Sequence, residues 1–163
     1  MDLAREIERK FLIPETPPLE GVRHARMRQG YLATGPTSVR VRDDGHTRTL
    51  TCKRGDGVAR TEVETTITCE QFDALWPLTD GQRIDKTRYY LPFGSYTVEL
   101  DIFHASLSPL VVAEVEFKSI EDSRNFTPPD YFGEELTHDY RYTNSHLSIH
   151  GIPADFPDKI AGK

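Results

Sequence analysis

The sequence predicts an α+β fold, an eight-stranded antiparallel β-barrel that surrounds a charged interior and carries a few flanking helices. Three observations predict it. Eight stretches alternate between two kinds of side chain, as β-strands with two different faces do. Turn-forming residues separate several neighbouring stretches, which favours antiparallel pairing. Seven of the stretches place full charges on one parity, and the sign of the charge changes from stretch to stretch.

The first five strands are expected in the N-terminal half. Pro14, Pro17 and Pro18 follow the first strand and predict a loop. Asp43-Asp44-Gly45 is a hairpin signal between the third and fourth strands, and Gly55-Asp56-Gly57 separates the fourth from the fifth. The predicted strands cover residues 5–13, 22–33, 37–43, 47–54 and 58–68.

A short helix over 70–76 is predicted next, because Phe72, Leu75 and Trp76 would share one face that packs on the barrel. Three more strands follow at 82–92, 95–104 and 110–119. After Pro128-Pro129 the tail differs in composition and is expected to hold two short helices, at 130–135 and 143–150. Thr143 or Asn144 is the expected cap of the second helix.

The bulk composition bounds the class of protein. A length of 163 residues suits a single domain over 1–163 with its own core. The net charge of −6 argues against non-specific binding to nucleic acid or to an acidic membrane surface. Cys52 and Cys69 are too few for a disulfide framework or a zinc site, so a reducing, cytoplasmic location is expected. No signal segment or apolar membrane span is evident.

Charge follows strand parity along the chain. Alternate residues of a strand share one face, so each strand is expected to present its charges on one wall. The first strand carries Glu6, Glu8 and Lys10, and the fifth carries Arg60, Glu62 and Glu64. The third, fourth and sixth strands carry only bases on that parity: Arg40, Arg42, Lys53, Lys86 and Arg88. The seventh and eighth carry Glu99, Asp101, Glu114 and Glu116, with Lys118 at the end of the eighth.

For any one strand, a charged face is most often a face that water solvates. The seven charged faces taken together favour another interpretation. Few Ser, Thr, Asn or Gln residues occur among the charges, and acidic and basic residues lie on different strands. A closed barrel with these charges inside would place a basic wall opposite an acidic wall. A dry interior could not hold them. A wet interior that binds a polyanion together with a divalent metal could, since bases neutralise phosphates and carboxylates hold the cation.

These motifs, taken in order, resemble the CYTH superfamily, also called the triphosphate tunnel metalloenzymes. The resemblance covers nearly the whole chain and preserves the order of the motifs. It rests on Glu6-Ile7-Glu8-Arg9-Lys10, Gln29-Gly30-Tyr31-Leu32, Val39-Arg40-Val41-Arg42, Cys52-Lys53-Arg54, Arg60-Thr61-Glu62-Val63-Glu64, Lys86-Thr87-Arg88-Tyr89, Glu99-Leu100-Asp101, Glu114-Val115-Glu116 and the tail Asp139-Tyr140-Arg141-Tyr142-Thr143-Asn144-Ser145.

The resemblance implies an eight-stranded antiparallel tunnel of the short, single-domain bacterial form. It implies an enzyme that binds triphosphate compounds with Mg²⁺ or Mn²⁺. The leading expectation is hydrolysis of inorganic triphosphate to phosphate and pyrophosphate, with ATP or thiamine triphosphate as substitute substrates. Positioning and electrostatics would supply most of the acceleration.

The resemblance also assigns roles. Its phosphate-binding residues are Lys10, Arg40, Arg42, Lys53, Lys86 and Arg88, among which Lys10 and Lys86 join Glu6 and Glu8 as catalytic candidates. Metal ligands are expected at Glu6, Glu8 and Glu116. Supporting roles, in orienting bases or holding a second metal, fall to Glu62, Glu64, Glu99, Asp101 and Glu114, for which structural ion pairing is an equal alternative.

Other side chains are less informative. Tyr31 and Tyr142 would point into the tunnel or pack below it. The six histidines lack metal-ligand spacing, and His138, His146 and His150 are left out of the predicted site.

Four rival functions stay open. An adenylate cyclase would need an adenine pocket, which no stretch indicates. A thiamine triphosphatase would use the same tunnel. A binding module without turnover would be expected to lose the metal carboxylates first, and Glu6, Glu8 and Glu116 are present. A plain β-domain would require the charge parity to be coincidence. A homodimer is a further expectation, because outer barrel faces rich in Val, Leu and Ile need covering.

Overall fold

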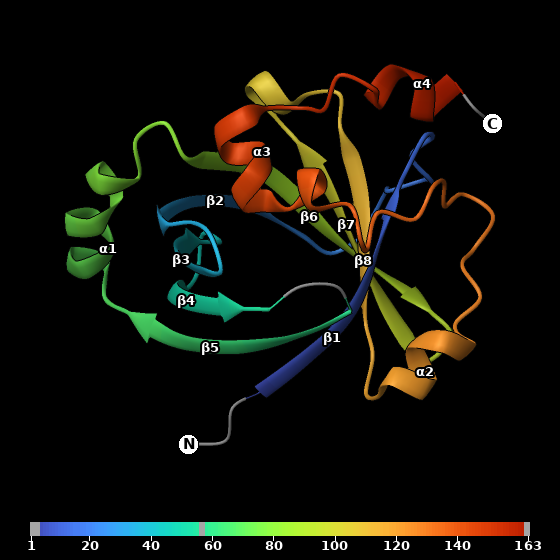
Figure 1. Ribbon diagram of the computed structural model, residues 1–163, viewed down its shortest axis with the longest axis horizontal. Helices are drawn as coiled ribbons and strands as arrows, with labels where there is room; N and C mark the ends of the chain where they lie inside the picture. Colours follow the sequence, from blue (N-terminus) through green and yellow to red (C-terminus); the bar gives the residue numbers. More distant parts are fainter. Residues whose placement is uncertain (1–3, 56–57, 162–163) are drawn as a thin grey trace.

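Eight strands close into one barrel in the computed structural model, which describes residues 4–55 and 58–161. Their order around the barrel is β1-β5-β4-β3-β2-β6-β7-β8, and every neighbouring pair is antiparallel (Figure 1). The predicted barrel is therefore confirmed. The strands are β1 (Ala4–Leu12), β2 (His24–Ala33), β3 (Thr37–Asp43), β4 (Arg48–Arg54), β5 (Ala59–Ile67), β6 (Arg83–Phe93), β7 (Tyr96–Phe103) and β8 (Val111–Glu116).

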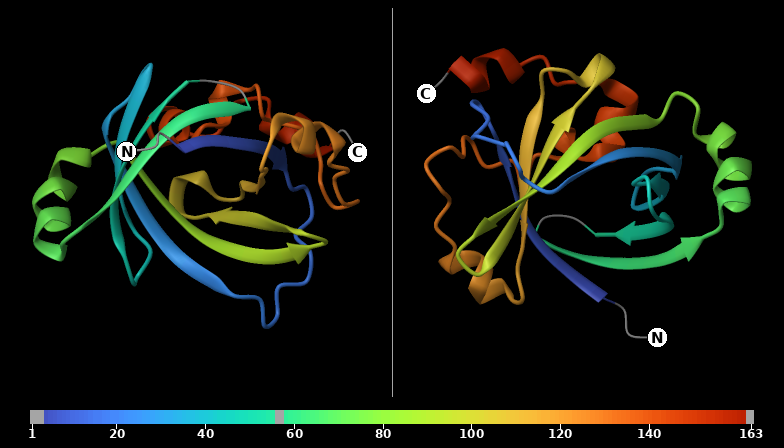
Figure 2. Two further views of the ribbon diagram at one scale, coloured as in Figure 1. Left: turned by 90° about the horizontal axis from the view of Figure 1, so that it is seen from below. Right: turned by 180° about the vertical axis from the view of Figure 1, so that it is seen from behind.

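Short helices decorate the barrel. Figure 2 shows α1 on one side of it and α2 and α4 on the other. The tail returns across the barrel, and α3 lies over the interior against β2 and β6 (Figure 1). The helices are α1 (Cys69–Leu75), α2 (Ile120–Asn125), α3 (Asn144–His150) and α4 (Phe156–Ala161), with 3-10 turns η1 (Trp76–Thr79), η2 (Ala105–Leu107) and η3 (Tyr140–Tyr142).

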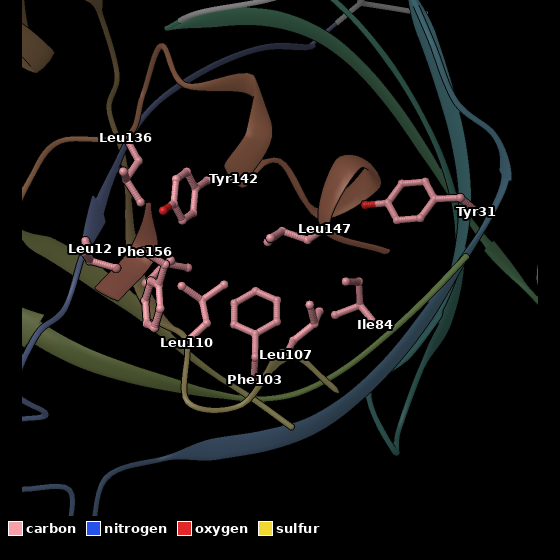
Figure 3. Close-up of a cluster of buried hydrophobic side chains, with 11 residues drawn as sticks. Leu12, Tyr31, Ile84, Phe103, Leu107, Leu110, Leu136, Tyr142, Leu147 and Phe156 are labelled. Carbon is pink, nitrogen blue, oxygen red and sulfur yellow. The ribbon is translucent and has the colours of Figure 1, made fainter. Parts of the chain in front are cut away.

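Side-chain alternation on these strands separates two environments. On β8, Val112 and Glu114 face inward while Ala113 and Val115 belong to a cluster on the outer face, beneath α2 and the segment that follows it. A second hydrophobic cluster fills one end of the barrel (Figure 3). It consists of Leu12, Tyr31, Ile84, Phe103, Leu107, Leu110, Val112, Leu136, Tyr142, Leu147 and Phe156. We call this cluster the apolar plug. It fills one end of the barrel, so the charged part of the interior lies in the remainder.

The predicted helix over 130–135 is wrong. Residues 130 and 131 form a turn, and the chain then runs extended beside β1. The Gly133 N–H donates to the Leu12 carbonyl (2.7 Å), and Leu12 N–H donates to the Glu134 carbonyl (2.9 Å). A Cβ at Gly133 would lie 2.8 Å from Pro14, so only glycine allows this close approach. Backbone groups that a helix would need are therefore used by β1.

Other element boundaries also differ from expectation. The eighth strand ends at Glu116 and not at residue 119, because Ser119 caps α2 by accepting from the Asp122 N–H. Lys118 consequently lies outside the strand, exposed, and the prediction that it continues the inner face is wrong. Neither α2 nor α4 is among the predicted helices. The helices expected at 70–76 and 143–150 are present as α1 and α3, each with a threonine N-cap.

Two further points concern the sequence-based expectations. Asp56 and Gly57 of the predicted turn lie outside the described residues. Within residues 4–55 and 58–161, no helix combines the length and apolar character needed to cross a membrane.

Arg9 fastens the tail to the outer face of β1. Its guanidinium donates two hydrogen bonds to Glu135 (2.8 and 2.7 Å) and further ones to the carbonyls of Ser123 (2.9 Å) and Phe126 (3.3 Å). It also stacks over the Phe11 ring at 5.0 Å. One side chain thus joins β1, the end of α2 and the returning tail.

We predict that Arg9→Ala lowers the free energy of unfolding by about 2–3 kcal/mol, since partly buried carbonyls and a carboxylate lose a charged donor. Arg26→Ala is the matched control. Arg26 also makes two hydrogen bonds to a carboxylate, that of Asp85, but its side chain is 61% exposed against 17% for Arg9. Its loss should cost less than about 1 kcal/mol in the same urea titration. Equal losses of unfolding free energy in the two variants would contradict this stabilising role of Arg9.

Candidate functional site

A cavity of about 1160 Å³ lies inside the barrel, and every strand contributes at least one lining side chain. Charged residues dominate its barrel wall, whereas η3 and α3 form a boundary of aromatic, histidine and small polar residues. The charged lining residues of the strands are Glu6, Glu8, Lys10, Arg40, Arg42, Lys53, Arg54, Arg60, Glu62, Glu64, Arg88, Glu99, Glu114 and Glu116. The prediction of a charged interior is therefore confirmed.

The signs of these charges divide the barrel into two arcs. The consecutive strands β7-β8-β1-β5 contribute all the cavity-lining carboxylates, which form an acidic arc. The other four strands, β4-β3-β2-β6, contribute a basic arc of Arg40, Arg42, Lys53, Arg54 and Arg88. Lys10 and Arg60 stand within the acidic arc. A polarised cavity of this kind suits a polyanion and a cation bound side by side.

Most bases of the cavity are already neutralised by the protein. Lys53 Nζ lies 2.8 Å from a carboxylate oxygen of Glu6 and 2.8 Å from one of Glu62. Burial and Arg40 oppose the charge of Lys53, but these two carboxylates outweigh them and raise its pKa. Arg60 forms ion pairs with Glu8 and Glu6 in the same region.

Lys10 bridges the barrel wall and the tail. Its Nζ lies 3.0 Å from Glu114 and donates to the Tyr142 carbonyl of η3 at 3.2 Å. Burial of Glu114 disfavours its charge, yet Lys10 and Arg88 outweigh burial and hold the pKa of that carboxyl well below its usual range. The contact between Lys10 and η3 fixes the tail at the edge of the cavity.

Arg88 is the centre of the strongest ion-pair network. It donates two hydrogen bonds of 2.7 Å to Asp101 and one of 3.1 Å to Glu114, and it also pairs with Glu99. The Lys86 Nζ donates a hydrogen bond of 2.6 Å to Asp101, and the Lys86 side chain is fully buried. Burial lowers the pKa of Lys86 to about 8 against the opposing effect of Asp101. Arg88, Glu99 and Glu114 of this network line the cavity.

Arg40 and Arg42 differ from Lys10, Lys53, Arg60 and Arg88, which form ion pairs inside the cavity. In the described part of the chain neither guanidinium has an ion pair, and the buried Nε of each lacks a hydrogen-bond partner. Both line the cavity, and Arg40 is only 8% exposed. An unpaired, nearly buried cation is costly unless an anion occupies the space beside it. These two guanidiniums are therefore the side chains of the cavity best prepared for an added anion.

The acidic arc has the opposite excess. The strand register sets Glu8 opposite Glu116, and Glu99 opposite Glu114. Like charges directly opposite destabilise a strand pair. Burial raises the pKa of Glu116, and Glu6, Glu99 and Glu62 raise it further. A cation bound at Glu116 would remove this repulsion.

The donor set of the acidic arc fits a hard divalent cation. Mg²⁺ and Mn²⁺ prefer carboxylate oxygens, and Mg²⁺ needs only one or two of them beside water and substrate oxygens. Among residues 4–55 and 58–161, no group of three or more histidine, cysteine or acidic side chains is already gathered tightly enough to hold a metal alone.

The structure brings together almost all of the predicted site residues. Lys86 and Asp101 are the exceptions, because both lie beneath Arg88 and neither lines the cavity. Contact between Lys86 and a ligand stays a prediction, and the geometry favours a positioning role through Asp101. Of the two tyrosines, Tyr31 lines the cavity, whereas Tyr142 packs in the plug at 0% exposure (Figure 3).

Sequence reasoning missed the contribution of the tail. His138, His146 and His150 were left out, yet all three line the cavity together with Tyr140 and Ile149. Their spacing along the chain carries no metal-ligand signal, and only the return of the tail across the barrel places them there. The one available signal was the tail motif itself, which begins at Asp139.

A family model, the CYTH domain, matches residues 4–142. The chain belongs to the CYTH domain family. Two curated relatives are named inorganic triphosphatase. The relative from Nitrosomonas europaea is 46% identical over 149 residues, which are 88% of this chain and 97% of the relative. The one from Acetivibrio thermocellus is 34% identical over 148 residues, with coverage of 89% and 94%.

A solved structure agrees with this assignment. The crystal structure of an inorganic triphosphatase matches the CYTH chain with a TM-score of 0.68 and 41% identity, and the match covers 91% of this chain and 97% of that one. The CYTH family implies a divalent metal, in keeping with the oxygen donors of the acidic arc.

We predict that Arg40→Met raises the free energy of unfolding of the ligand-free CYTH chain by about 0.5–1 kcal/mol, because it removes an unpaired cation beside Lys53. Arg88→Met should instead lower it by about 3–5 kcal/mol, since Asp101 and Glu114 lose their partner. Both substitutions delete one guanidinium from the same cavity, so each controls for the other. The free energies of unfolding are measured by denaturation in guanidinium chloride. If Arg40→Met and Arg88→Met destabilised the protein equally, Arg40 would have a stabilising partner.

Proposed function

We propose that this protein hydrolyses inorganic triphosphate to phosphate and pyrophosphate with the help of a divalent metal. One observation carries the proposal. Among the described residues, Arg40 and Arg42 present guanidiniums without an ion pair to the same cavity in which Glu116 lies near Glu6, Glu99 and Glu62, whose repulsion outweighs the attraction of Lys53 and raises the pKa of Glu116. Opposite excesses of charge on two walls match a polyanion bridged to a cation. The two curated relatives named inorganic triphosphatase support the choice of reaction.

Arg40 and Arg42 would bind the phosphate chain first. A guanidinium offers parallel N–H donors that match phosphate oxygens. Both side chains line the cavity, and neither pairs with a carboxylate of the described residues. Lys53 and Lys10 would add point charges once their carboxylate partners turn to a cation. Each currently shares its charge with the acidic arc, Lys53 with Glu6 and Lys10 with Glu114.

Glu6, Glu8 and Glu116 would hold the metal, and Glu62, Glu64, Glu99 and Glu114, which line the same cavity, would support it. When bound, the metal supplies charge neutralisation at phosphate oxygens and a template that orients them. Both Mg²⁺ and Mn²⁺ suit this donor set, and we propose either as the physiological ion.

The reaction breaks one phosphoanhydride bond by adding water. The water oxygen forms a bond to a terminal phosphorus, the bridging P–O bond breaks, and the pyrophosphate leaves with the bridging oxygen. The protein contributes by positioning the chain and stabilising charge on the equatorial and leaving oxygens. Arg88 is held rigid for this task by Asp101, which Lys86 supports from below. Carboxylates of the acidic arc are the acceptors available for the proton of the water.

Substrate range and surroundings complete the proposal. Inorganic triphosphate is the preferred substrate, and thiamine triphosphate or ATP are substitutes that place the same three phosphates on the basic arc. We propose a cytoplasmic protein, in line with Cys52 and Cys69 both being free thiols. A homodimer remains a prediction for light scattering.

The decisive experiment is incubation with inorganic triphosphate in Mg²⁺, in Mn²⁺ and in excess chelator, with phosphate and pyrophosphate both quantified. We predict metal-dependent release of the two products in equal amounts. Glu8→Gln should lower kcat/KM by at least about 100-fold, because removing a transition-state charge contact typically costs this much. Arg40→Met should mainly raise KM through the loss of a phosphate contact.

Arg26→Met is the matched control, since Arg26 lies on the outer face with Asp85 and its loss leaves the cavity unchanged. ATP is run alongside. A cyclic nucleotide with pyrophosphate from ATP, and no release from inorganic triphosphate, would replace the proposal by the cyclase alternative. Binding of triphosphate without any turnover would leave a binding module.

A further inference from the structure

The segment Gln29-Gly30-Tyr31 of β2 contains a buried polar side chain to which the proposed reaction assigns no task. Gln29 is 0% exposed. Its Nε2 donates a hydrogen bond of 3.2 Å to the Tyr31 hydroxyl, whereas its buried Oε1 has no hydrogen-bond partner among residues 4–55 and 58–161. Buried polar atoms of folded proteins are nearly always hydrogen-bonded, so an unpartnered one requires an explanation.

Alternation along β2 places Gln29 on the inner face of the barrel. Tyr31, two residues further on, lines the cavity, and Figure 3 shows its ring projecting from β2 into the interior. Gly30 between them faces outward, where a Cβ would lie 2.4 Å from the Thr79 Oγ1 of η1. The glycine therefore lets η1 pack against the outer face, while Gln29 and Tyr31 lie together inside.

Arg42 is the charged neighbour of Gln29 on this inner face. The strand register sets Gln29 directly opposite Arg42 of β3 on one side and Ile84 of β6 on the other. Ile84 and Met27, the residue two positions before Gln29, are both apolar and buried. Arg42 lines the cavity, and its buried Nε lacks a hydrogen-bond partner in the described part of the chain. A donor and an acceptor without partners thus belong to directly opposed residues.

These two atoms can meet without any movement of the backbone. Directly opposed residues have Cβ atoms about 4.5–5.5 Å apart, so a change of rotamer can bring the Arg42 Nε–H to the Gln29 Oε1. A guanidinium that is held through Nε keeps both terminal nitrogens free. These nitrogens are the parallel donors that match two oxygens of a phosphate.

We propose that Gln29 is a positioning residue for phosphate binding, whose Oε1 accepts a hydrogen bond from the Arg42 Nε–H and so aims the guanidinium at the phosphate chain. The inference rests on the proposed function, since it takes inorganic triphosphate as the ligand of Arg42. Arg88 is held by the carboxylate of Asp101, which also neutralises it. A neutral amide holds Arg42 without neutralising it, so the full charge of the guanidinium is kept for the ligand.

A double-mutant cycle tests this role. Calorimetry in excess chelator measures the binding of inorganic triphosphate, and steady-state assays in Mg²⁺ give kcat and KM. Gln29→Met keeps the length of the side chain and removes the amide. We expect it to weaken binding and to raise KM by at least about tenfold, the lower end of the effect of losing a hydrogen bond to a charged group. The value of kcat should change by less than about twofold, because the lost contact serves binding.

The second half of the cycle repeats Gln29→Met in the Arg42→Met protein. There it should change the affinity for inorganic triphosphate by less than about twofold, because no guanidinium is left to position. An unchanged affinity in Gln29→Met alone would overturn the inference. An equal loss with and without Arg42 would overturn it as well.

Thr79→Val is the matched control. Thr79 is also 0% exposed and packs against the same strand, but from outside the barrel, and its hydroxyl donates to the Trp76 carbonyl at 2.7 Å. Its loss should lower the urea midpoint of unfolding and leave the affinity for inorganic triphosphate unchanged. Gln29→Met should show the reverse, because it removes an unpartnered buried oxygen and should not lower the midpoint.

The measurements separate this inference from the proposed function. Binding of inorganic triphosphate that depends on Gln29 through Arg42, without hydrolysis in Mg²⁺ or Mn²⁺, would support the positioning role and overturn the proposed function. Hydrolysis with an affinity and a KM that Gln29→Met leaves unchanged would overturn the positioning role alone. A protein that neither binds nor hydrolyses inorganic triphosphate in Mg²⁺, in Mn²⁺ or in chelator would overturn both.

Discussion

Charge balance inside the barrel is the constraint on which the rest of the structure depends. Charges that leave water must be paired, and the pairing must be geometrically good, or the folded state loses several kcal/mol per ion. Arg88 meets this condition through its hydrogen bonds to Asp101 and Glu114. The buried Lys86 donates a further hydrogen bond to Asp101. The network ties β6, β7 and β8 together and leaves its polar edge facing the cavity.

The same rule explains how one cavity can hold so many charged side chains. Lys53 of the basic arc forms ion pairs with Glu6 and Glu62 of the acidic arc. Lys10 forms an ion pair with Glu114 within the acidic arc, so most of the cavity's charges are neutralised by one another. A polyanion and a cation that arrive together can exchange these internal pairs for external ones at little net cost. Among residues 4–55 and 58–161 Arg40 has no ion pair, and its buried Nε lacks a hydrogen-bond partner, so its charge is not balanced in this way.

The tail both packs in the hydrophobic cluster at one end of the barrel and lines part of the cavity. Leu147 and Tyr142 close one end of the barrel with apolar surface, and they set the position of the backbone that carries Tyr140. Residues of the plug face the core, whereas their neighbours in sequence face the cavity. The helical and 3-10 geometry of this segment makes the division possible, because successive side chains point in different directions.

The sequence by itself determined the strands, the parity of their charges and almost every charged residue that the strands contribute to the cavity wall, because a period of two maps directly onto the faces of a strand. Only the tertiary structure decided which charged residues of a strand line the cavity and which are buried, and where the tail runs. Lys86 shares its parity with Arg88, yet the plug buries one and the cavity receives the other. The tail was misjudged at 130–135 and in its histidines, since its conformation is set by hydrogen bonds to β1, which lies more than a hundred residues away in the chain. Local pattern cannot report a contact that only the closed barrel creates.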